Sequence, residues 1–519
     1  MQLTDCICVR VCDGYNIYMS NERGHLWRRI KPYVMGFILL WWGTMVFFLV
    51  KRNIVPRVSD LPDFNVVEMG ELISEDYYSV TFKGKKIGYN SVIKRKLPSG
   101  LLYQETSYYN LTIGGISQEI TTEGLITVDD SLRAKVLTFH FSGGGYETNI
   151  NAIVREDQLL VEINTPSGSR NIKLPFDGEI YTSSVIPELI KRRGFESGRF
   201  ELPSFDPITA NSRSYKVDVI GRDRLRRFGD RDVWEVRLFY GPLTTGLWID
   251  STGVLLMEKT AEGFMSVREN KEKALKFDLR QSADIDFLSE FAVSLGGSVI
   301  ERPRDAVRLV IKIKNLQTEL FNLNDFNQRW DPDSQTLVID SRGFDDSLSF
   351  VVLSEDTLAS LDIQCNDRRI ISAAEKITRD SKTDFDKVKA INTYLFKKID
   401  KNLTASIPNA VEVLQKMRGD CNEHTILFVA LARAIGIPAR MNVGLLYLDG
   451  YFYYHAWPQA YIDSAWHTFD PTLGQSPTDA AHIKLTSGNL DQMLALLRFG
   501  DARLSFIDVE YEGEEIEQR

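Results

Sequence analysis

Cysteine is scarce and unevenly placed in this chain of 519 residues. Cys6, Cys8 and Cys12 cluster near the start, and only Cys365 and Cys421 follow. So few thiols leave no disulfide framework for the large C-terminal part of the chain. The early cluster lacks the further cysteine or suitably spaced histidine that would complete a four-ligand zinc site. We therefore expect neither a bound metal nor a cofactor.

A basic excess is also missing. The chain carries 62 Lys and Arg against 71 Asp and Glu, which gives a formal net charge of −9. Nucleic-acid-binding domains usually show the opposite balance, so no nucleic-acid partner is expected. The sequence has no internal repeat, low-complexity tract or phosphate-binding glycine loop, and the three glycines at 143–145 are interpreted as a loop between strands. The length predicts two or three domains.

Only one long hydrophobic run is present, the eighteen uncharged residues 33–50. That length just spans the hydrocarbon core of a bilayer. The exit at 48–52 has no small-residue cleavage site, which favours an uncleaved anchor over a signal peptide. Basic residues are slightly more numerous before the run than after it, which places the C-terminal bulk outside the cytoplasm. We predict a single-pass protein of the bacterial inner membrane, with a short N-terminal segment (1–32), a transmembrane helix (33–50) and a linker (51–68).

Residues 69–290 have the pattern of a large antiparallel β-rich domain. Runs that alternate apolar with polar residues are separated by turn residues, as hairpins require. The alternation predicts that one face of the sheet is solvated or lines a cavity. A scaffold and a ligand-binding sheet are both compatible with it. The strand-like runs are 77–82, 87–93, 101–113, 116–128, 132–141, 159–163, 215–220, 233–240, 247–249 and 254–259.

The rest of the chain divides into a small β unit (291–364), a domain at 365–485 and a C-terminal segment (486–519) with a helix and an acidic tail. Apolar residues repeat along one face of the stretch 383–399, which is typical of an amphipathic helix. The predicted elements are strands at 307–313, 336–339 and 348–353, and helices at 369–379, 383–399, 409–417 and 490–499.

The most informative stretch of the sequence runs from 419 to 471. Asp420 can cap a helix that starts at Cys421 and continues as an apolar, helix-forming run. The strand patterns that follow place His455 near the middle of one strand and Asp470 at the end of another. A thiol, an imidazole that takes its proton and a carboxylate that orients the imidazole are the parts of a cysteine-nucleophile site.

Each of these three residues also has a structural interpretation. A cysteine in an apolar helix is usually inert core, a histidine on a strand is usually a satisfied polar group, and Asp-Pro is usually a turn. Their order along the chain, together with the helix-start and strand-end contexts, favours the catalytic interpretation.

Four motifs resemble those of the transglutaminase-like superfamily, whose members are circularly permuted relatives of papain-like thiol enzymes. The motifs are RGDCNE at 418–423, ARAIGIPAR at 432–440, HAW at 455–457 and WHTFDPT at 466–472. The resemblance covers roughly residues 365–485. It implies an α+β fold with a papain-like core, in which the helix bearing the cysteine packs on an antiparallel sheet.

The same resemblance implies that Cys421 is the nucleophile, His455 the base and Asp470 its orienting carboxylate. It leaves the reaction open, because the superfamily contains transglutaminases, peptidases, deamidases and inactive members. We expect a membrane-anchored cysteine hydrolase or acyltransferase that acts on a protein or peptide amide. The alternative is a non-catalytic binding or assembly module of the cell envelope.

Two further expectations concern reactivity. The start of a helix and an imidazole partner both favour the thiolate, so we expect Cys421 to have a lowered pKa and to be alkylated much faster than Cys365. The nearby Asp362 and Asp367 disfavour the thiolate of Cys365.

Other residues close to the motifs are interpreted as structural. Trp457 and Trp466 are expected to pack around His455, and Glu423 and Arg440 to bond to the local backbone. His467 lies on the opposite strand face from Asp470, so it is left out of the triad, while no orientation is assigned to His424.

Overall fold

The computed structural model describes residues 70–513, except 156–157, 176–177, 207–210, 242, 278–284, 319–320, 345–350, 404–405, 489–498 and 500–501. The chain divides into two units, Met1–Glu68 and Met69–Arg519, and the described residues belong to the second. The predicted N-terminal segment, membrane anchor and linker lie outside the described residues and stay predictions. In the described part of the chain, no helix combines the length and the apolar character needed to cross a membrane.

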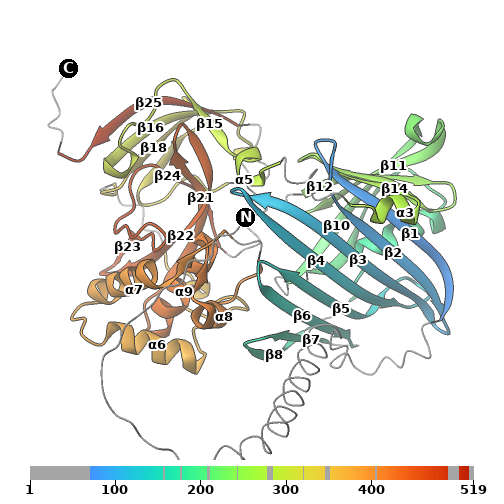
Figure 1. The fold of residues 1–519 in the computed structure, drawn as a ribbon, viewed down its shortest axis with the longest axis horizontal. Coiled ribbons are helices and arrows are strands. Elements are labelled where there is room, and N and C mark those ends of the chain that lie inside the picture. Colours follow the sequence, from blue (N-terminus) through green and yellow to red (C-terminus); the bar gives the residue numbers. More distant parts are fainter. Residues whose placement is uncertain are drawn as a thin grey trace, which may run out of the picture. The chain divides into compact units, whose positions relative to one another are not determined.

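An antiparallel sheet of fourteen strands extends over residues 71–269 (Figure 1). Its order is β8-β7-β6-β5-β4-β3-β2-β1-β14-β13-β12-β11-β10-β9, so two meanders meet where β1 pairs with β14. The predicted antiparallel β-rich domain is therefore confirmed. The strands are Glu71–Phe82 (β1), Lys85–Leu97 (β2), Gly100–Ile113 (β3), Ile116–Val128 (β4), Ala134–Gly143 (β5), Tyr146–Val154 (β6), Gln158–Thr165 (β7), Gly168–Pro175 (β8), Gly198–Asp206 (β9), Asn211–Leu225 (β10), Arg231–Tyr240 (β11), Leu243–Asp250 (β12), Leu255–Thr260 (β13) and Phe264–Glu269 (β14).

Glycine pairs close two of these hairpins. Gly144 and Gly145, which connect β5 to β6, have φ values of 58° and 81°. Two-residue hairpin turns of this kind need a positive φ at both central positions, which only glycine adopts at little cost. The glycine-rich stretch predicted as a loop is therefore a tight turn.

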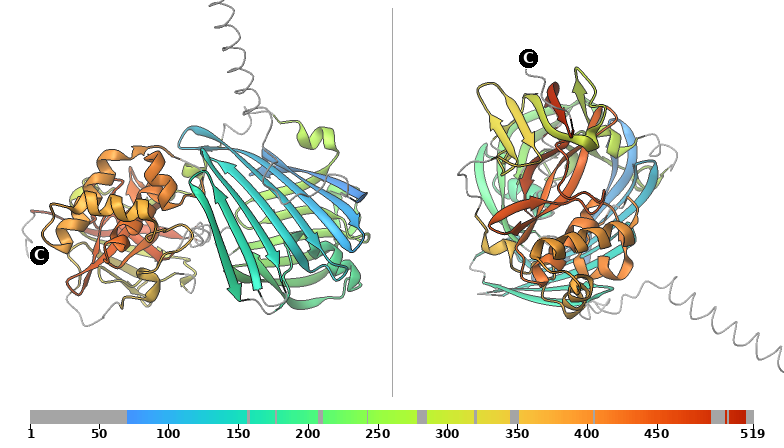
Figure 2. Two further views of the ribbon diagram at one scale, coloured as in Figure 1. Left: turned by 90° about the horizontal axis from the view of Figure 1, so that it is seen from below. Right: turned by 90° about the vertical axis from the view of Figure 1, so that its left-hand side faces the viewer.

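Four helices precede the strands that carry the candidate site. They are α6 (Arg368–Thr378), α7 (Asp384–Lys398), α8 (Ala410–Lys416) and α9 (Cys421–Ala434), as predicted within one or two residues. The residue before each helix accepts a backbone N–H from its first turn, so all four helix starts are capped. Helix α9 is buried along almost its whole length and packs on β21 (Ala439–Leu448) and β22 (Tyr451–Ile462). Figure 2 shows the orange helices of this part of the chain beside its orange-red strands. This is the helix-on-sheet core of an α+β domain.

A second sheet joins segments that are far apart in the sequence. Its order is β17-β18-β16-β25-β15-β22-β21-β24, with β23 paired to β22. The predicted strands at 307–313 and 336–339 are confirmed, whereas Val351–Leu353 is not a strand and 348–350 lies outside the described residues. The remaining bounds are Val293–Gly296 (β15), Ala306–Lys314 (β16), Gln328–Asp331 (β17), Thr336–Asp340 (β18), Ala465–Thr468 (β23), His482–Ser487 (β24) and Arg503–Tyr511 (β25).

Strand β25 was not predicted. In the sheet it lies between β16 and β15. In the sequence its last two residues, 510 and 511, fall within the predicted acidic tail. Leu504 enters the apolar core of this sheet, while Glu510 on the same strand forms ion pairs with Arg308 and Arg342. Glu510 thus pairs with basic neighbours, while the part of the predicted acidic tail from 514 on lies outside the described residues. The predicted helix at 490–499 lies outside the described residues except for Phe499.

Gly444 of β21 should be sensitive to substitution. A Cβ atom there would lie 2.0 Å from the carbonyl oxygen of Ile483 and 2.9 Å from the ring of Trp457. We expect Gly444→Ala to lower the free energy of unfolding by about 1–3 kcal/mol, as overpacking does, measured as a lower urea midpoint. The control is Gly124→Ala in the other sheet, where the nearest atom to a new Cβ is 3.7 Å away. Equal midpoints for the two variants would contradict the expected clash.

Candidate active site

Cys421 is the first residue of α9, as predicted. Asp420 accepts the backbone N–H of Asn422 at 2.9 Å, and Glu423 accepts that of Asp420 at 2.8 Å, which together form a capping box. The preceding Gly419 has φ +156°, and a Cβ on it would lie 2.3 Å from the Glu423 side chain. The sequence Gly-Asp-Cys-Asn-Glu thus fixes where the helix, and with it the thiol, begins.

Burial decides the protonation state of this thiol. Burial raises the pKa of Cys421 well above its usual range, and the carboxylates of Asp420, Glu423 and Asp470 add to the effect. The backbone of Ala456 acts on the pKa in the opposite direction. The predicted lowering of the Cys421 pKa is therefore wrong: the helix start does not compensate for the effects of burial and of the negative neighbours.

The Cys365 thiol also has a raised pKa, for the same leading reason. It is buried, and burial outweighs the opposing effect of Arg433. The predicted contrast in thiol pKa between the two cysteines is not supported.

His455 and Asp470 are paired, as predicted. The Nε2 atom of His455 on β22 lies 2.9 Å from Oδ2 of Asp470, and both side chains are buried. Because a carboxylate can only accept, Nε2 carries the hydrogen and Nδ1 of the neutral ring is left as the base. The Asp470 carboxylate is also close enough to the Cys421 thiol to contribute to the raised pKa of that thiol.

Asp470 is held in its ionised form. Oδ1 accepts the backbone N–H groups of Thr472 and Leu473 at 2.7 and 3.0 Å, while Oδ2 accepts from His455. Burial alone would raise the pKa of Asp470, but the bonds and charges of His455 and His482 hold it well below its usual range.

His482 is a member of the site that the sequence analysis missed. Its Nε2 lies 3.2 Å from Oδ2 of Asp470, and its Nδ1 lies 2.8 Å from Oδ1 of Asp479. Burial opposes the charged ring, but Asp479 and Asp470 outweigh it and raise the pKa of His482 to about 9. His482 follows Asp470 by twelve residues and Asp479 by three, and this spacing is the only local signal in the sequence that could have indicated it.

The same side chains meet the distance condition for a metal site. One ligand atom each from His455, Asp470 and His482 lie within 4.8 Å of one another. These side chains are already hydrogen-bonded to each other, and His482 would have to lose its proton before Nε2 could bind a metal. The arrangement fits a hydrogen-bonded chain better than a metal centre.

The remaining residues near the motifs make structural contacts, but two of these contacts differ from the predictions. Trp466 packs on Tyr461 and Arg440 instead of around His455. Arg440 bonds to side chains instead of to the local backbone. The Trp457 ring is buried and stacks on His455 with a centroid distance of 6.0 Å. Arg440 bonds to Gln459 and stacks on Trp466. His467 contacts the Phe385 ring, away from the triad.

His424 points into the protein. It is fully buried, and its Nδ1 lies 2.6 Å from the carbonyl oxygen of Asp420. Its other ring nitrogen has no hydrogen-bond partner, and burial lowers the pKa of the ring. A neutral His424 therefore stabilises the first turn of α9 through its contact with the Asp420 carbonyl oxygen.

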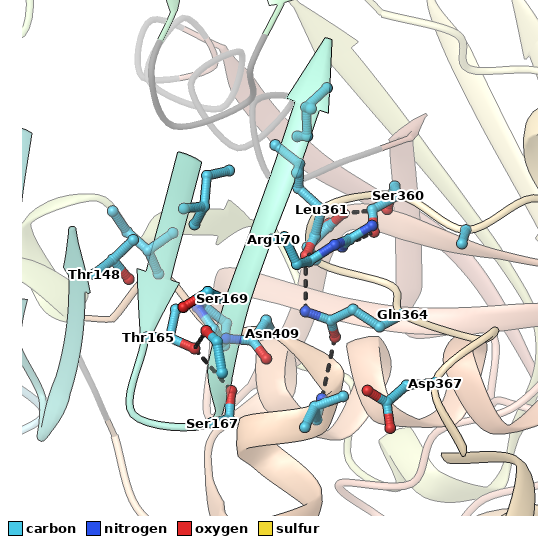
Figure 3. A pocket seen from close by; sticks show the side chains of 18 of the residues that line it. Thr148, Thr165, Ser167, Ser169, Arg170, Ser360, Leu361, Gln364, Asp367 and Asn409 are labelled. Atoms are coloured by element: carbon cyan, nitrogen blue, oxygen red, sulfur yellow. Dashed lines mark hydrogen bonds between the residues drawn. The ribbon is translucent and has the colours of Figure 1, made fainter. Parts of the chain in front are cut away.

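A separate cavity of about 500 Å³ lies between β6–β8 and the segment 359–369 (Figure 3). Arg170 crosses one side of it and donates to the carbonyl oxygens of Ser360 and Leu361. Gln364 links Leu361 to the backbone N–H of Val411 on α8. Neither Cys421 nor its partners line this cavity, so it is not where the thiol chemistry would occur.

Comparisons with known proteins concern the stretch that carries Cys421, His455 and Asp470. A family model described as the transglutaminase-like superfamily matches residues 371–471. No curated protein matches the chain. Three solved structures show distant likeness, at levels too low to assign an activity.

The first of these structures is a β-barrel-like domain of unknown function from Brucella abortus, with 11% identity, a TM-score of 0.32 and coverage of 39% of this chain and 98% of that one. A Cytophaga hutchinsonii protein, provisionally described as a cysteine protease, has 18% identity, a TM-score of 0.25 and coverage of 42% and 83%. A Parabacteroides distasonis protein, provisionally described as a protease, has 10% identity, a TM-score of 0.18 and coverage of 65% and 69%.

The raised pKa of His482 predicts a stability that depends on pH. Its folded pKa of about 9 exceeds the roughly 6.5 of an unfolded histidine, so its contribution is complete below about pH 6.5 and is lost as the pH rises to about 9. We expect the difference in unfolding free energy between the unsubstituted protein and His482→Gln to shrink by on the order of 3 kcal/mol over this range. Urea titrations at several pH values measure it. A difference that does not change with pH would contradict a charged His482.

Proposed function

Residues 371–471 belong to the transglutaminase-like superfamily, and on that premise we propose that this protein is a cysteine acyl-transfer enzyme acting on protein or peptide amides. The observation that carries the proposal is the pairing of His455 with Asp470 at 2.9 Å, in a stretch whose Cys421 thiol is close enough to Asp470 to be affected by its charge. This arrangement leaves the Nδ1 atom of His455 as the base for the adjacent thiol.

The raised pKa of Cys421 indicates how the reaction begins. Because the thiol is protonated at rest, His455 takes its proton at Nδ1 while the sulfur attacks the substrate carbonyl carbon. The carbonyl π electrons move to oxygen, and Asp470 stabilises the imidazolium that forms. A preformed thiolate is not required.

The remaining steps follow from the same groups. The oxyanion can accept from the backbone N–H of Cys421 at the start of α9, one half of an oxyanion hole. The oxyanion then collapses, the C–N bond breaks, and His455 donates its proton to the leaving amine, which leaves a thioester on Cys421. Water or a second amine then attacks the thioester while His455 accepts the proton of the attacking group. The C–S bond breaks, and His455 returns the proton to the Cys421 sulfur. Water gives hydrolysis, and an amine gives a new amide.

An activated ester tests the proposal without knowledge of the natural substrate. Full-length protein is incubated with p-nitrophenyl acetate, and the acetylated peptides are identified by mass spectrometry. We expect acetylation at Cys421, its loss in Cys421→Ala, and a rate at least about 100-fold lower in His455→Ala, because that variant lacks the general base. The matched control is Cys365→Ser, which should acetylate like the unsubstituted protein.

Acetylation that is insensitive to His455→Ala, or equal at Cys365 and Cys421, would instead favour the non-catalytic module. A second arm with casein and a fluorescent primary amine separates the two enzyme types. Amine incorporation that depends on Cys421 indicates a transglutaminase, and cleavage or deamidation indicates a hydrolase.

A further inference from the structure

The Asp470 carboxylate has one more partner than its pairing with His455 requires. Oδ1 is occupied by the N–H groups of Thr472 and Leu473, and Oδ2 accepts from His455 at 2.9 Å and from His482 at 3.2 Å. All four donors converge on a side chain with no exposed surface. One of them, His482, comes from a strand that carries no other part of the proposed triad.

His482 is itself held by a second carboxylate. Its Nδ1 lies 2.8 Å from Oδ1 of Asp479, whose other oxygen accepts from Gln475 at 2.7 Å and lies 3.5 Å from Arg304. Both ring nitrogens of His482 therefore face carboxylate oxygens. A neutral imidazole can donate from only one nitrogen, so this environment suits the doubly protonated ring.

We propose that His482, oriented by Asp479, is a positioning residue for the reaction proposed above: its N–H and its charge fix Asp470 and moderate the hold of Asp470 on His455. The inference rests on the proposed function and adds a residue to it. The chain of contacts is Asp479–His482–Asp470–His455, buried throughout.

Positioning follows from the shared oxygen. Oδ2 of Asp470 lies between two ring N–H groups, so the carboxylate cannot rotate toward one without losing the other. The orientation of the His455 ring, and hence the direction of Nδ1 toward the thiol, depends on that oxygen. Without His482, Oδ2 would keep one donor and gain freedom to turn.

Charge has a separate effect. The rings of His455 and His482 are 5.6 Å apart between centroids. At that separation a positive charge on His482 disfavours a second positive charge on the His455 ring. His482 thus prevents Asp470 from holding the imidazolium so tightly that His455 fails to pass its proton to the leaving amine.

The charged groups that face His482 are few among the described residues. They are Asp479 and Asp470, with His455 beyond Asp470, while an edge of the ring meets Trp457. Lys484, two residues along the same strand, is paired with Asp325. Removal of the His482 charge should therefore act mainly through Asp470.

Three variants of the full-length protein test the inference. His482→Gln keeps an N–H near the Asp470 oxygen but removes the charge, His482→Phe removes both, and His467→Gln makes the same change at a histidine outside the chain of contacts. The readouts are kcat and KM for p-nitrophenyl acetate and the rate of iodoacetamide labelling at Cys421, each followed from pH 5 to 10. Labelling is resolved by peptide and normalised to folded protein.

We expect both limbs of the His482→Gln profile to move to higher pH by about half a unit or more, because each proton of the Cys421–His455 pair is lost less easily without the nearby charge. Its maximal kcat should stay within about threefold of the unsubstituted protein, and His482→Phe should lose at least about tenfold in kcat with KM unchanged. His467→Gln should match the unsubstituted protein.

Superimposable pH profiles for His482→Gln, His467→Gln and the unsubstituted protein would overturn the inference and leave His482 a packing residue. That result differs from a failure of the proposed function, in which His455→Ala would leave both the labelling and the turnover unchanged. If His482→Phe does not fold, the profile of His482→Gln still decides.

Discussion

An ionised carboxylate that is buried away from water is stable only where donors surround it. Asp470 meets this condition with donors from the turn that follows it, from β22 and from β24. A slip of either strand by one residue would turn its histidine to the other face of the sheet and leave the carboxylate short of a donor. The hydrogen bonds of one side chain therefore constrain the register of three strands, since β21 lies between β22 and β24.

Local signals predicted much of this arrangement, and its failures share one cause. The cap at Asp420, the apolar run after Cys421 and the strand around His455 are properties of short segments, and each matches the structure. His482 and β25 depend on pairing between distant segments, which no short pattern encodes. The prediction of a lowered Cys421 pKa was wrong for the same reason. A helix start can be recognised in the sequence, but the burial of the thiol and the carboxylates around it cannot.

A second buried charge cluster connects the predicted small β unit to the strands of the site. Asp325 has no exposed surface and bonds to Lys484 on β24, to Gln459 on β22 and, at 3.5 Å, to Arg440 on β21. Three strands thus supply its partners. Loss of one member of such a cluster leaves a buried charge uncompensated. The small β unit (291–364) is therefore energetically part of the same folding unit as the site.

The position of β25 has a consequence for the order of events during synthesis. This strand (503–511) separates β16 (306–314) from β15 (293–296), although both are made much earlier in the sequence. Until residues 503–511 emerge from the ribosome, β16 and β15 each keep an unpaired edge, the kind of surface on which chains associate wrongly. The sheet that carries the site must therefore wait for its last strand, and contacts so distant in sequence close slowly. A nascent chain of this protein would depend on some cover for those two edges while translation continues.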